Sequence, residues 1–323
     1  MRSPLLVILA GGASSRLWPL EEKSLIEFMG RPLLSFQLDR YRELGLTEAV
    51  IVANPENEGV IRSLAGSVPG LAVQVVVQPE PKGMGDALLQ LRGKLANRSR
   101  PLYITQVHDL TDVTLHERML TAYESGAAQA YLAGCRVSEY FPGGYLVLGD
   151  GGRITDIVEK PGAGNEPSDL VSIVAHIHTD AALLLDAIEA EYARDIPTDD
   201  HYERAMAGLM RSHRFQAVPY DGPWRAIKFP WHVLDVMQWM LERIDEPRIA
   251  PDAQIEEGVL IKGNVVIDSG ARLFHGATIV GPAYIGQGAI VGNGALVRES
   301  MIGARSVVGY STEVARSYMG VDV

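Results

Sequence analysis

The sequence predicts an α/β domain with a mostly parallel sheet, followed by a second domain built as a short parallel β-helix. The chain has 323 residues, more than one hydrophobic core usually serves, so we expect two domains. Up to about residue 245, β-branched apolar runs alternate with helix-like stretches, and after Ile249 apolar residues recur every six positions. Apolar residues make up 47% and charged residues 21%, a composition typical of globular proteins rather than of long disordered chains.

Alternating strands and helices define the first domain. The expected strands are Leu5–Ala10, Ala49–Ala53, Val73–Gln78 and Leu102–Val107, and the expected helices are Leu33–Leu44, Gly85–Leu95 and Leu115–Glu124. Unbroken β-branched runs joined by helices are typical of a parallel sheet that is covered on both faces. Val233–Ile244 has the apolar spacing of a further helix, which Asp245-Glu246-Pro247 ends. We therefore place the first domain at residues 1–246 and the second at residues 247–323.

The second domain is predicted from its six-residue period. Apolar side chains stand in register at Ile249, Ile255, Ile261, Ile267, Leu273, Ile279, Ile285, Val291 and Val297, and after a slip of one residue at Ile302, Val308 and Val314. A helix cannot use a period of six, whereas a solenoid of very short strands can, because each strand stacks on its copy one turn away. The pattern resembles the left-handed β-helix of hexapeptide-repeat proteins, with three hexapeptides to a turn, so about four turns are implied.

The net charge and the cysteine content limit which partners and which cellular compartment we expect for this protein. Lys and Arg number 29 and Asp and Glu number 40, so the net charge of −11 makes the chain a poor partner for nucleic acid or anionic membranes. The single cysteine, Cys135, excludes an intrachain disulfide. No apolar run approaches the ~20 residues that span a bilayer, and Leu5–Ala10 is too short for a signal-peptide core. We expect a cytoplasmic protein with no nucleic acid or membrane partner.

A glycine pair after the first strand predicts a phosphate loop. The strand leads into Leu9-Ala10-Gly11-Gly12, where two residues without a Cβ let the backbone turn sharply and approach a ligand. The N–H groups of such a turn can converge on phosphate oxygens. Arg16 and Lys23 follow, and they supply the positive charge that a polyphosphate needs. The spacing matches neither G-x-G-x-x-G nor G-x-x-x-x-G-K-[ST], so neither a dinucleotide-binding loop nor a Walker loop is predicted.

The whole string from Leu9 to Leu20 resembles the opening signature of sugar-1-phosphate nucleotidylyltransferases, the enzymes that make nucleotide sugars. Similar segments follow in the family's order: Lys23-Ser24-Leu25, Gly30-Arg31-Pro32-Leu33-Leu34, Gln78, Gly83, Gly85-Asp86-Ala87-Leu88, Val107-His108-Asp109, Ile157-Val158-Glu159-Lys160-Pro161, Trp224 and Pro230-Trp231-His232-Val233-Leu234. In one branch of the family a hexapeptide-repeat tail follows, so the resemblance covers nearly the whole chain. It implies a Rossmann-like nucleotidyltransferase fold for the first domain.

The resemblance implies an enzyme that joins an NTP to a sugar 1-phosphate and releases pyrophosphate. The attacking phosphate oxygen is already anionic near neutral pH, so no general base is needed, and catalysis is mainly charge neutralisation and positioning. On the family's pattern, Arg16 and Lys23 are the catalytic residues, because they neutralise charge on the leaving pyrophosphate and the α-phosphate. The nucleotide would be held by Leu9, Ala10, Gly11 and Gly12.

The remaining site residues are also implied by the resemblance. Gln78 and Gly83 would read the base, and the family favours uracil or thymine at this position, so UTP or dTTP is the expected donor. The sugar phosphate would be bound by Gly144, Glu159 and Lys160. Asp109 would bind Mg²⁺, which prefers carboxylate and phosphate oxygens.

Three positions depart from the family's pattern. The second metal-binding aspartate is Ala226 here, the glycine before the first one is His108, and the glycine after the sugar motif is Val174. Asp221 and Asp235 are nearby carboxylates, but neither has the right spacing. Because a lost carboxylate weakens a Mg²⁺ site, a second hypothesis is a catalytically impaired homologue that binds a nucleotide sugar and regulates a partner. A third is a small cytidylyltransferase of the molybdopterin or isoprenoid type, which has a similar loop but usually lacks the Glu-Lys-Pro segment and the repeats.

The end of the repeat domain predicts an oligomer. A β-helix exposes its last turn as an unpaired apolar edge unless something caps it. The sequence stops at Val321-Asp322-Val323 with no capping helix. Either the last turn packs on another subunit or the natural chain continues. We expect a homo-oligomer that forms partly through the repeats.

Overall fold

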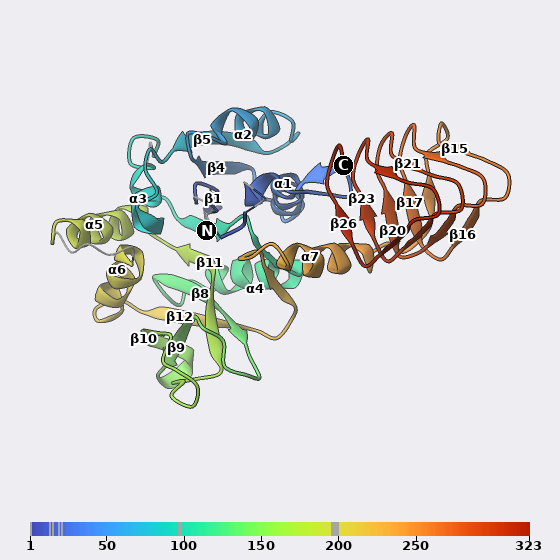
Figure 1. The fold of residues 1–323 in the computed structure, drawn as a ribbon. Coiled ribbons are helices and arrows are strands. Elements are labelled where there is room, and N and C mark those ends of the chain that lie inside the picture. Colours follow the sequence, from blue (N-terminus) through green and yellow to red (C-terminus); the bar gives the residue numbers. More distant parts are fainter. Residues whose placement is uncertain are drawn as a thin grey trace. The chain divides into compact units, whose positions relative to one another are not determined.

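The structure is a computed structural model that describes residues 2–12, 14, 16–18, 20, 22–95, 99–194 and 200–323 (Figure 1). Ala13, Ser15 and Pro19 of the predicted phosphate loop lie outside the described residues. The chain divides into two compact units: residues 1–13 and 37–224 form the first, and residues 14–36 and 225–323 form the second. The domain boundary at residue 246 stays a prediction, and helix α7 (His232–Leu241) groups with the second unit.

Among its described residues, the first unit is built on a nine-stranded sheet. The strands follow one another across the sheet as β5 (Ala72–Val77), β4 (Glu48–Ala53), β1 (Leu5–Leu9), β6 (Leu102–Gln106), β11 (Leu170–His178), β8 (Ala130–Arg136), β12 (Phe215–Tyr220), β10 (Arg153–Glu159) and β9 (Gly144–Leu148). The pairs from β5 to β6 are parallel, as predicted. β11 runs antiparallel to β6 and β8, and β10 runs antiparallel to β12 and β9. The α/β fold is confirmed, but the sheet is mixed rather than mostly parallel, because four of its eight neighbouring strand pairs are antiparallel. The antiparallel part lies where no strand bounds were predicted.

A helix occurs close to each of the four predicted ranges, and three further helices among the described residues form where no helix bounds were predicted. The helices are α1 (Leu33–Glu43), α2 (Glu58–Ala65), α3 (Gly83–Leu89), α4 (Val113–Glu124), α5 (Ala181–Tyr192), α6 (His201–Met210) and α7, and the three without predicted bounds are α2, α5 and α6. Helix α3 ends at Leu89, before the predicted end at Leu95, while α1 and α4 agree with the prediction to within two residues at each end. No helix among the described residues is long and apolar enough to cross a lipid bilayer.

Local sequence accounts for the ends of these helices. Asp180 caps α5, because its Oδ1 accepts hydrogen bonds from the backbone N–H groups of Ala182 at 2.9 Å and Leu183 at 3.3 Å. After α1 the chain turns at Gly45, whose φ of +82° suits glycine and whose N–H donates to Arg42 O at 2.9 Å. An aspartate cap thus marks the start of α5, and a glycine marks the turn after α1.

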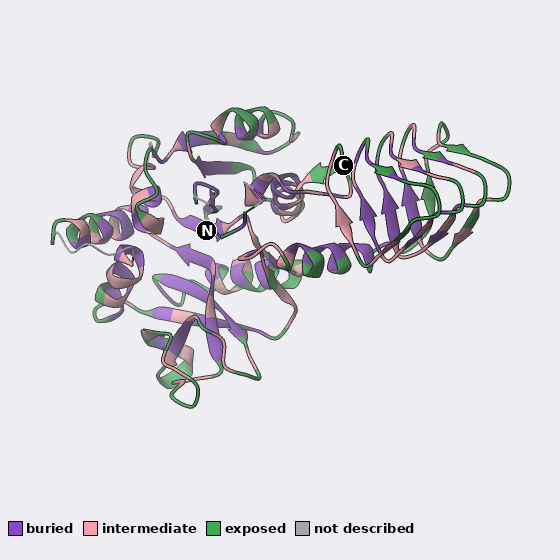
Figure 2. Cartoon of the chain, viewed as in Figure 1, coloured by how far each residue is buried: buried purple, intermediate pink, exposed green. Residues whose placement is uncertain are grey.

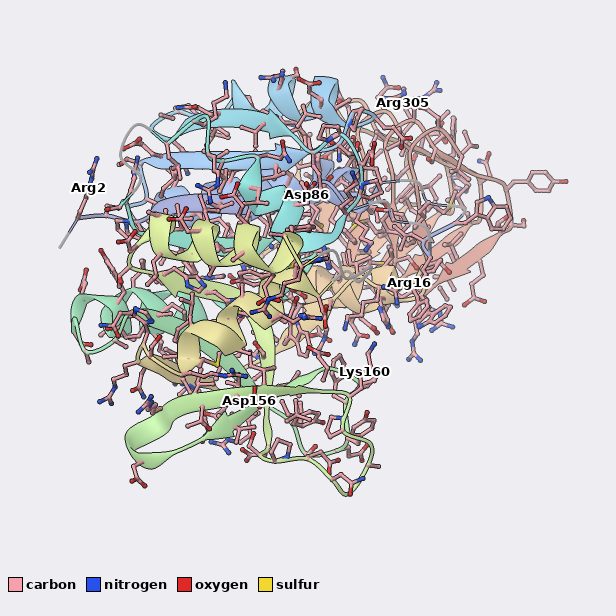
Figure 3. All side chains as sticks on the ribbon, turned by 90° about the vertical axis from the view of Figure 1, so that its left-hand side faces the viewer. Arg2, Arg16, Asp86, Asp156, Lys160 and Arg305 are labelled. Atoms are coloured by element: carbon pink, nitrogen blue, oxygen red, sulfur yellow. The ribbon has the colours of Figure 1, made fainter. Side chains whose placement is uncertain are left out.

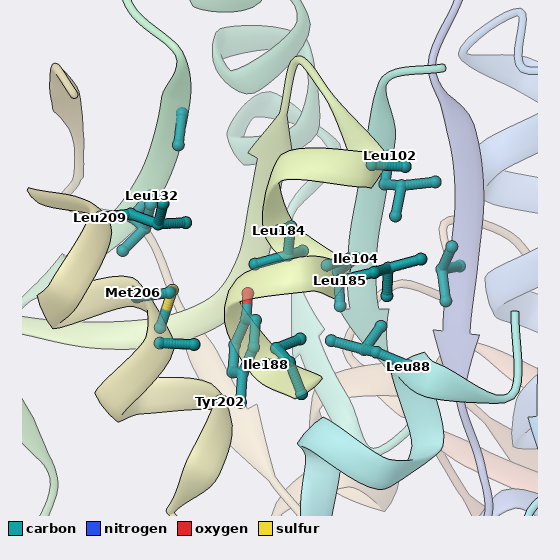
Figure 4. Close-up of a cluster of buried hydrophobic side chains, with 14 of the residues drawn as sticks. Leu88, Leu102, Ile104, Leu132, Leu184, Leu185, Ile188, Tyr202, Met206 and Leu209 are labelled. Carbon is teal, nitrogen blue, oxygen red and sulfur yellow. The ribbon is translucent and has the colours of Figure 1, made fainter. Parts of the chain in front are cut away.

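Helices α3, α5 and α6 share one buried cluster with the sheet (Figure 4). Leu88 of α3, Leu185 of α5 and Met206 of α6 pack there with Ile104 of β6 and Leu132 of β8, and all five side chains are buried. Burying a side chain of this size stabilises the fold by about 1.5–3 kcal/mol. The cluster fixes α3 against the sheet, which matters below because α3 follows the predicted base-reading residue.

The second unit contains a parallel β-helix of three sheets. In the part of the chain that the structure describes, the first sheet is β14 (Arg248–Ile249), β17 (Val265–Ile267), β20 (Ala283–Ile285), β23 (Met301–Ile302) and β26 (Tyr318–Met319). The second is β15 (Gln254–Ile255), β18 (Arg272–Leu273), β21 (Ile290–Val291) and β24 (Val307–Val308), and the third is β16 (Leu260–Lys262), β19 (Thr278–Val280), β22 (Leu296–Arg298) and β25 (Glu313–Ala315). Neighbouring strands pair in parallel, as expected of the predicted left-handed β-helix.

The length of each coil explains the six-residue period and its slip. Ile267 pairs with Ile285, and Ile285 in turn pairs with Ile302, so the later coil is one residue shorter than the earlier one. The shorter coil keeps these three side chains in one column, and all of them are buried. Figure 2 shows strands β17, β20 and β23 as buried, whereas the strands of the first coil and many of the connecting corners are largely exposed. The predicted solenoid is therefore confirmed, including the change of phase.

The two ends of the β-helix differ. At the last coil, Tyr318 donates its hydroxyl to Glu27 O at 2.6 Å, and its ring centroid lies 5.6 Å from that of Phe28. Residues of strand β2 (Glu27–Phe28) thus cover part of this end. Three side chains of the first coil are partly exposed, Ile249 at 45%, Ile255 at 38% and Leu260 at 44%. The first coil therefore carries exposed apolar side chains, and the last coil keeps some as well, with Val307 at 52% and Val323 at 64%.

Candidate functional site

The candidate site begins at the ends of β1, β4, β5 and β6. Leu9, the last residue of β1, pairs with Val52 of β4 and with Gln106 of β6. Gln78 follows the end of β5, which pairs with β4. The segments after these parallel strands therefore leave the sheet at the same edge, where ligands of open α/β sheets bind.

The glycine loop lies against β4 and Gln78. A Cβ on Gly11 would lie 3.1 Å from Gln78 Oε1 and 3.2 Å from Ala53 O, so glycine allows an approach that a larger residue would disturb. Among the described residues, a Cβ on Gly12 would meet no atom within 4 Å, so none of them fills the space beside it. The structure thus brings Gly11 and Gln78 together, as the resemblance implied.

Asn57 anchors the same loop and was not predicted from the sequence. Its Nδ2 donates to Ala10 O at 2.9 Å, its Oδ1 accepts from Asn54 N at 2.9 Å, and its side chain is buried. Leu9 and Ala10 are buried as well, so they shape the loop through their backbone. The signal in the sequence was the pair of asparagines directly after β4, since asparagine side chains often bond to loop backbone.

Gln78 is bonded to the protein through its amide nitrogen. Its side chain is buried, and Nε2 donates to Gly83 O at 3.0 Å and to Asp86 Oδ2 at 2.9 Å. Gly83 begins α3 with a φ of +87°, in the left-handed region that favours glycine. The predicted pair of Gln78 and Gly83 is therefore brought together, and Asp86 joins it.

Asp109 is held by a tryptophan that sequence reasoning had not linked to it. Asp109 begins strand β7 (Asp109–Thr111), and its Oδ1 accepts a hydrogen bond from Trp224 Nε1 at 3.1 Å. Gln37 Nε2 donates to the backbone oxygen of Asp109 at 3.0 Å. The Trp224 ring packs on Phe141, with 4.9 Å between the ring centroids. These contacts fix Asp109 while Trp224 engages only one of its two carboxylate oxygens.

A cluster of acidic ligands does not surround Asp109. Within the described ranges, the structure contains no group of three or more His, Cys, Asp or Glu side chains that could hold a metal ion. Asp221 was considered as a replacement for the carboxylate missing at Ala226, but its Oδ1 accepts from Arg136 Nε at 2.9 Å. One carboxylate still fits Mg²⁺, which proteins often hold through one or two carboxylates together with substrate phosphates.

The residues predicted to bind the sugar phosphate meet at β9 and β10. Gly144 and Glu159 face each other across this strand pair, and a Cβ on Gly144 would lie 2.5 Å from Glu159 Oε1. Lys160 follows with a φ of +45°, and its N–H donates to Gly143 O at 3.1 Å. Glu159 and Lys160 are exposed, and Figure 3 labels Lys160 at this part of the first unit. The absence of a Cβ at Gly144 thus leaves the space that the Glu159 carboxylate occupies.

The two predicted catalytic cations group with the second unit. The guanidinium carbon of Arg16 lies 5.6 Å from the centroid of the Phe229 ring, a cation–π contact. Lys23 begins a short 3-10 helix, Lys23–Leu25, in which Glu22 accepts a hydrogen bond from Ser24 N at 3.1 Å. Their roles in catalysis stay predictions.

Two histidines of β11 are buried and take no part in the predicted site. His176 Nδ1 lies 2.8 Å from Tyr202 Oη, and His178 Nε2 lies 3.1 Å from the same atom. Burial lowers the pKa of His176 to about 4 and the pKa of His178 to about 3. Both imidazoles are therefore neutral near pH 7 and form a polar contact inside the core. Val174 lies just before them, where the pairing of β11 with β8 shifts its register.

Comparison with known sequences assigns most of the first unit to one family. Residues 5–221 match the family described as nucleotidyl transferase. A bifunctional sugar-1-phosphate nucleotidylyltransferase/acetyltransferase of Sulfurisphaera tokodaii is 26% identical over 273 residues, which cover 82% of this chain and 62% of that protein. Mannose-1-phosphate guanylyltransferase 1 of Arabidopsis thaliana is 26% identical over 276 residues, which cover 83% of this chain and 72% of that protein. The chain thus spans less than two thirds of the length of the Sulfurisphaera tokodaii relative.

Solved structures show the same fold. A UDP-glucose pyrophosphorylase from Acinetobacter baumanii matches with a TM-score of 0.64 and 19% identity, over 76% of this chain and 95% of that one. A UDP-glucose pyrophosphorylase complexed with UDP-glucose matches with a TM-score of 0.62 and 17% identity, over 75% of this chain and 100% of that one. At these identities the likeness establishes the fold alone.

Proposed function

The chain belongs to the nucleotidyl transferase family, and on that basis we propose that it transfers a nucleotidyl group from an NTP to a sugar 1-phosphate and releases pyrophosphate. The observation that carries the proposal is the junction of Gly11 and Gln78, where an added Cβ would lie 3.1 Å from Oε1. A loop without side chains beside a buried carboxamide supports a site that takes phosphates and a base together. The product would be a nucleotide sugar.

The chain's own residues act in this proposal by binding and positioning. The backbone N–H groups of Gly11 and Gly12 approach the phosphates, because neither residue carries a Cβ. Glu159 accepts hydrogen bonds from sugar hydroxyls, and Lys160 binds the sugar phosphate. Lys23, together with Arg16, neutralises the charge that builds on the α-phosphate and the leaving pyrophosphate. No side chain has to remove a proton, because the attacking phosphate oxygen is already anionic.

Asp109 is the proposed ligand of a divalent cation, with Mg²⁺ as the ion. Its carboxylate offers one oxygen that Trp224 does not engage, which suits an ion that is otherwise held by substrate phosphates and water. When bound, Mg²⁺ neutralises part of the phosphate charge. Trp224 keeps the carboxylate in one orientation. In many metal sites, residues that hydrogen-bond to a metal ligand orient that ligand in the same way.

The proposed donor is UTP or dTTP, and the proposed acceptor is a sugar 1-phosphate. The activities named for the relatives and for the similar structures support a sugar 1-phosphate, but they differ in the nucleotide, from guanylyl to uridylyl transfer. We further propose that the protein works in the cytoplasm as a homo-oligomer. Light scattering at micromolar concentration tests the last point, and a monomer would contradict it.

Pyrophosphate release in the presence of Mg²⁺ tests the function. Five NTPs are combined with several sugar 1-phosphates, and Asp109→Ala is compared with Asp186→Ala, which removes an exposed carboxylate of α5. We expect release with a limited set of NTPs, and a drop in kcat/KM of at least about 100-fold for Asp109→Ala only. Activity that survives both Asp109→Ala and Lys23→Ala would contradict the mechanism.

A second candidate function is favoured by the alanine at position 226. A homologue with an impaired metal site could bind a nucleotide sugar and regulate a partner. Such a homologue would bind nucleotide but release no pyrophosphate with any combination of NTP and sugar 1-phosphate. In that case Ala226→Asp would be expected to gain pyrophosphate release. The third reading, a small cytidylyltransferase, predicts that CTP is used without a sugar 1-phosphate.

A further inference from the structure

We infer that Asp86 is a positioning residue that fixes the carboxamide of Gln78, so that Gln78 offers the base an oxygen acceptor and no donor. The inference rests on the proposed function and narrows its donor substrates. With its oxygen as the acceptor, Gln78 selects bases whose central ring nitrogen on the Watson–Crick edge carries a hydrogen. Uracil, thymine and guanine belong to this class, whereas cytosine and adenine present a lone pair at that position.

The hydrogen bonds of Gln78 determine which way its amide points. Nε2 lies 2.9 Å from Asp86 Oδ2 and 3.0 Å from Gly83 O, and the side chain is only 4% exposed. A carboxylate and a backbone carbonyl are acceptors only. A reversed amide would place Oε1 against both of these oxygens and lose two hydrogen bonds. The nitrogen of Gln78 is therefore committed to the protein.

Both acceptors are themselves held in place. Gly83 has a φ of +87°, which directs its carbonyl and which residues with a Cβ adopt only with strain. Asp86 Oδ1 accepts a hydrogen bond from Gln90 Nε2 at 3.4 Å, and Asp86 O accepts one from the same nitrogen at 3.2 Å. The Asp86 carboxylate thus bridges Gln78 and Gln90.

Helix α3, which carries Asp86, is packed tightly against its neighbours. A Cβ on Gly85 would lie 3.2 Å from Ile188 Cγ2 and 3.2 Å from a ring carbon of Tyr192. Tyr192 donates its hydroxyl to Lys82 O at 2.8 Å, just before α3 begins. Figure 3 labels Asp86 on this helix, in the first unit. The carboxylate is therefore presented by a rigid element.

The oxygen of Gln78 faces the phosphate loop. A Cβ added to Gly11 would lie 3.1 Å from Oε1, so this atom borders the space that glycine leaves open. Binding is favoured when a buried acceptor receives a hydrogen bond from the ligand. It is disfavoured when the ligand presents a second acceptor instead, because the two oxygen or nitrogen atoms then face each other and neither can bond to water. The N3–H group of uracil or thymine, or the N1–H group of guanine, supplies the donor. The N3 lone pair of cytosine and the N1 lone pair of adenine would face an oxygen.

The test is a comparison of kcat/KM for UTP, dTTP, GTP, CTP and ATP in the wild type, Asp86→Ala, Asp86→Asn and the control Asp186→Ala. We expect the wild type to prefer its best N–H nucleotide to CTP and ATP by at least about 100-fold, since sites built around a buried hydrogen bond discriminate strongly. Asp86→Ala leaves Gly83 O as the sole anchor, so the preference over CTP should fall at least about tenfold, mainly through KM. Asp86→Asn keeps one acceptor oxygen, so its preference over CTP should lie between those of the wild type and Asp86→Ala. The control should retain the wild-type preference.

The outcomes separate this inference from the proposed function. A wild type that uses CTP or ATP best overturns the inference but not the nucleotidyl transfer. Equal losses for all five nucleotides in Asp86→Ala, with the preference unchanged, mean that Asp86 is merely structural and also overturn it. If the wild type releases no pyrophosphate, the proposed function fails. Equilibrium dialysis of radiolabelled UTP and CTP against the same variants then decides the inference, and equal binding of both nucleotides by the wild type would overturn it. If Asp86→Ala does not fold, Asp86→Asn carries the comparison.

Discussion

Acidification from pH 7 to pH 5 should destabilise the first unit through three buried histidines. Burial lowers the pKa of His116 to about 3, of His176 to about 4 and of His178 to about 3. In the unfolded chain each returns to about 6.5. A histidine whose folded pKa is depressed contributes stability that is present above the unfolded pKa. That stability is lost as the pH falls below it, because the unfolded chain then takes up protons that the folded chain excludes.

The size of the effect follows from these pKa values. At pH 5 an unfolded histidine is almost fully protonated, while the buried ones are still largely neutral. Integrating the linkage relation from pH 7 to pH 5 gives a loss of about 2 kcal/mol for each histidine, and about 6 kcal/mol for the three. Since whole proteins are stable by about 5–15 kcal/mol, this loss should be large enough to bring the unit close to unfolding.

Urea unfolding at pH 7, 6 and 5, followed by far-ultraviolet circular dichroism, measures this loss. His116 Nδ1 lies 2.6 Å from Tyr103 Oη, so His116→Gln keeps a hydrogen-bonding group there and removes the titration. It should reduce the pH-dependent loss by about one third, or about 2 kcal/mol, whatever its effect at pH 7. The control is His275→Gln, because His275 is exposed in the second unit. A wild type as stable at pH 5 as at pH 7, or equal losses in the wild type and His116→Gln, would refute the reasoning.

Three further substitutions probe the candidate site. Asn57→Ala leaves Ala10 O without its partner at 2.9 Å, so the free energy of unfolding in urea should fall by about 1–3 kcal/mol and the KM for the NTP should rise; an unchanged KM would argue against a role of this loop in binding. Gly144→Ala places a Cβ 2.5 Å from Glu159 Oε1, so the KM for the sugar 1-phosphate should rise roughly tenfold while the KM for the NTP stays the same, and a change in both would point to general damage. Trp224→Phe removes the N–H donor to Asp109 Oδ1 and should raise the Mg²⁺ concentration for half-maximal activity about tenfold; a titration curve that does not move would exclude the orienting role.

Features that depend on a local repeat or on a short segment could be predicted from the sequence. The six-residue period predicted the β-helix, and even the slip after Val297 corresponds to later coils that are shorter by a single residue. Gly11, Gly12 and Gln78 were assigned to one nucleotide site through the family resemblance, and in the structure each follows a parallel strand of one sheet. In the β-helix, by contrast, the spacing along the chain fixes the spacing in space.

Contacts between distant segments could not be predicted in the same way. Trp224 and Asp109 are 115 positions apart, and nothing in the spacing says that the indole N–H meets the carboxylate. Asp221 lies close to Ala226 in the sequence but lacks the family's spacing, and in the structure it pairs with Arg136, 85 positions away. Strand bounds could not be predicted for the antiparallel part of the sheet around β11, whose register shifts before His176. Packing and strand register determine which side chains meet across a sheet, and neither can be read from a single sequence.

The coil of the β-helix also sets how the gene for this domain can change length. Each strand pairs with its copy one full coil later, as Ile267 does with Ile285 and Ile285 with Ile302. An insertion or deletion of a few residues in a strand would rotate every later apolar side chain out of its column, whereas a whole coil could be gained or lost with the columns intact. The single residue dropped between the earlier and later coils was tolerated at a corner, where no column passes. Relatives of different length should therefore differ in this domain by steps of about one coil.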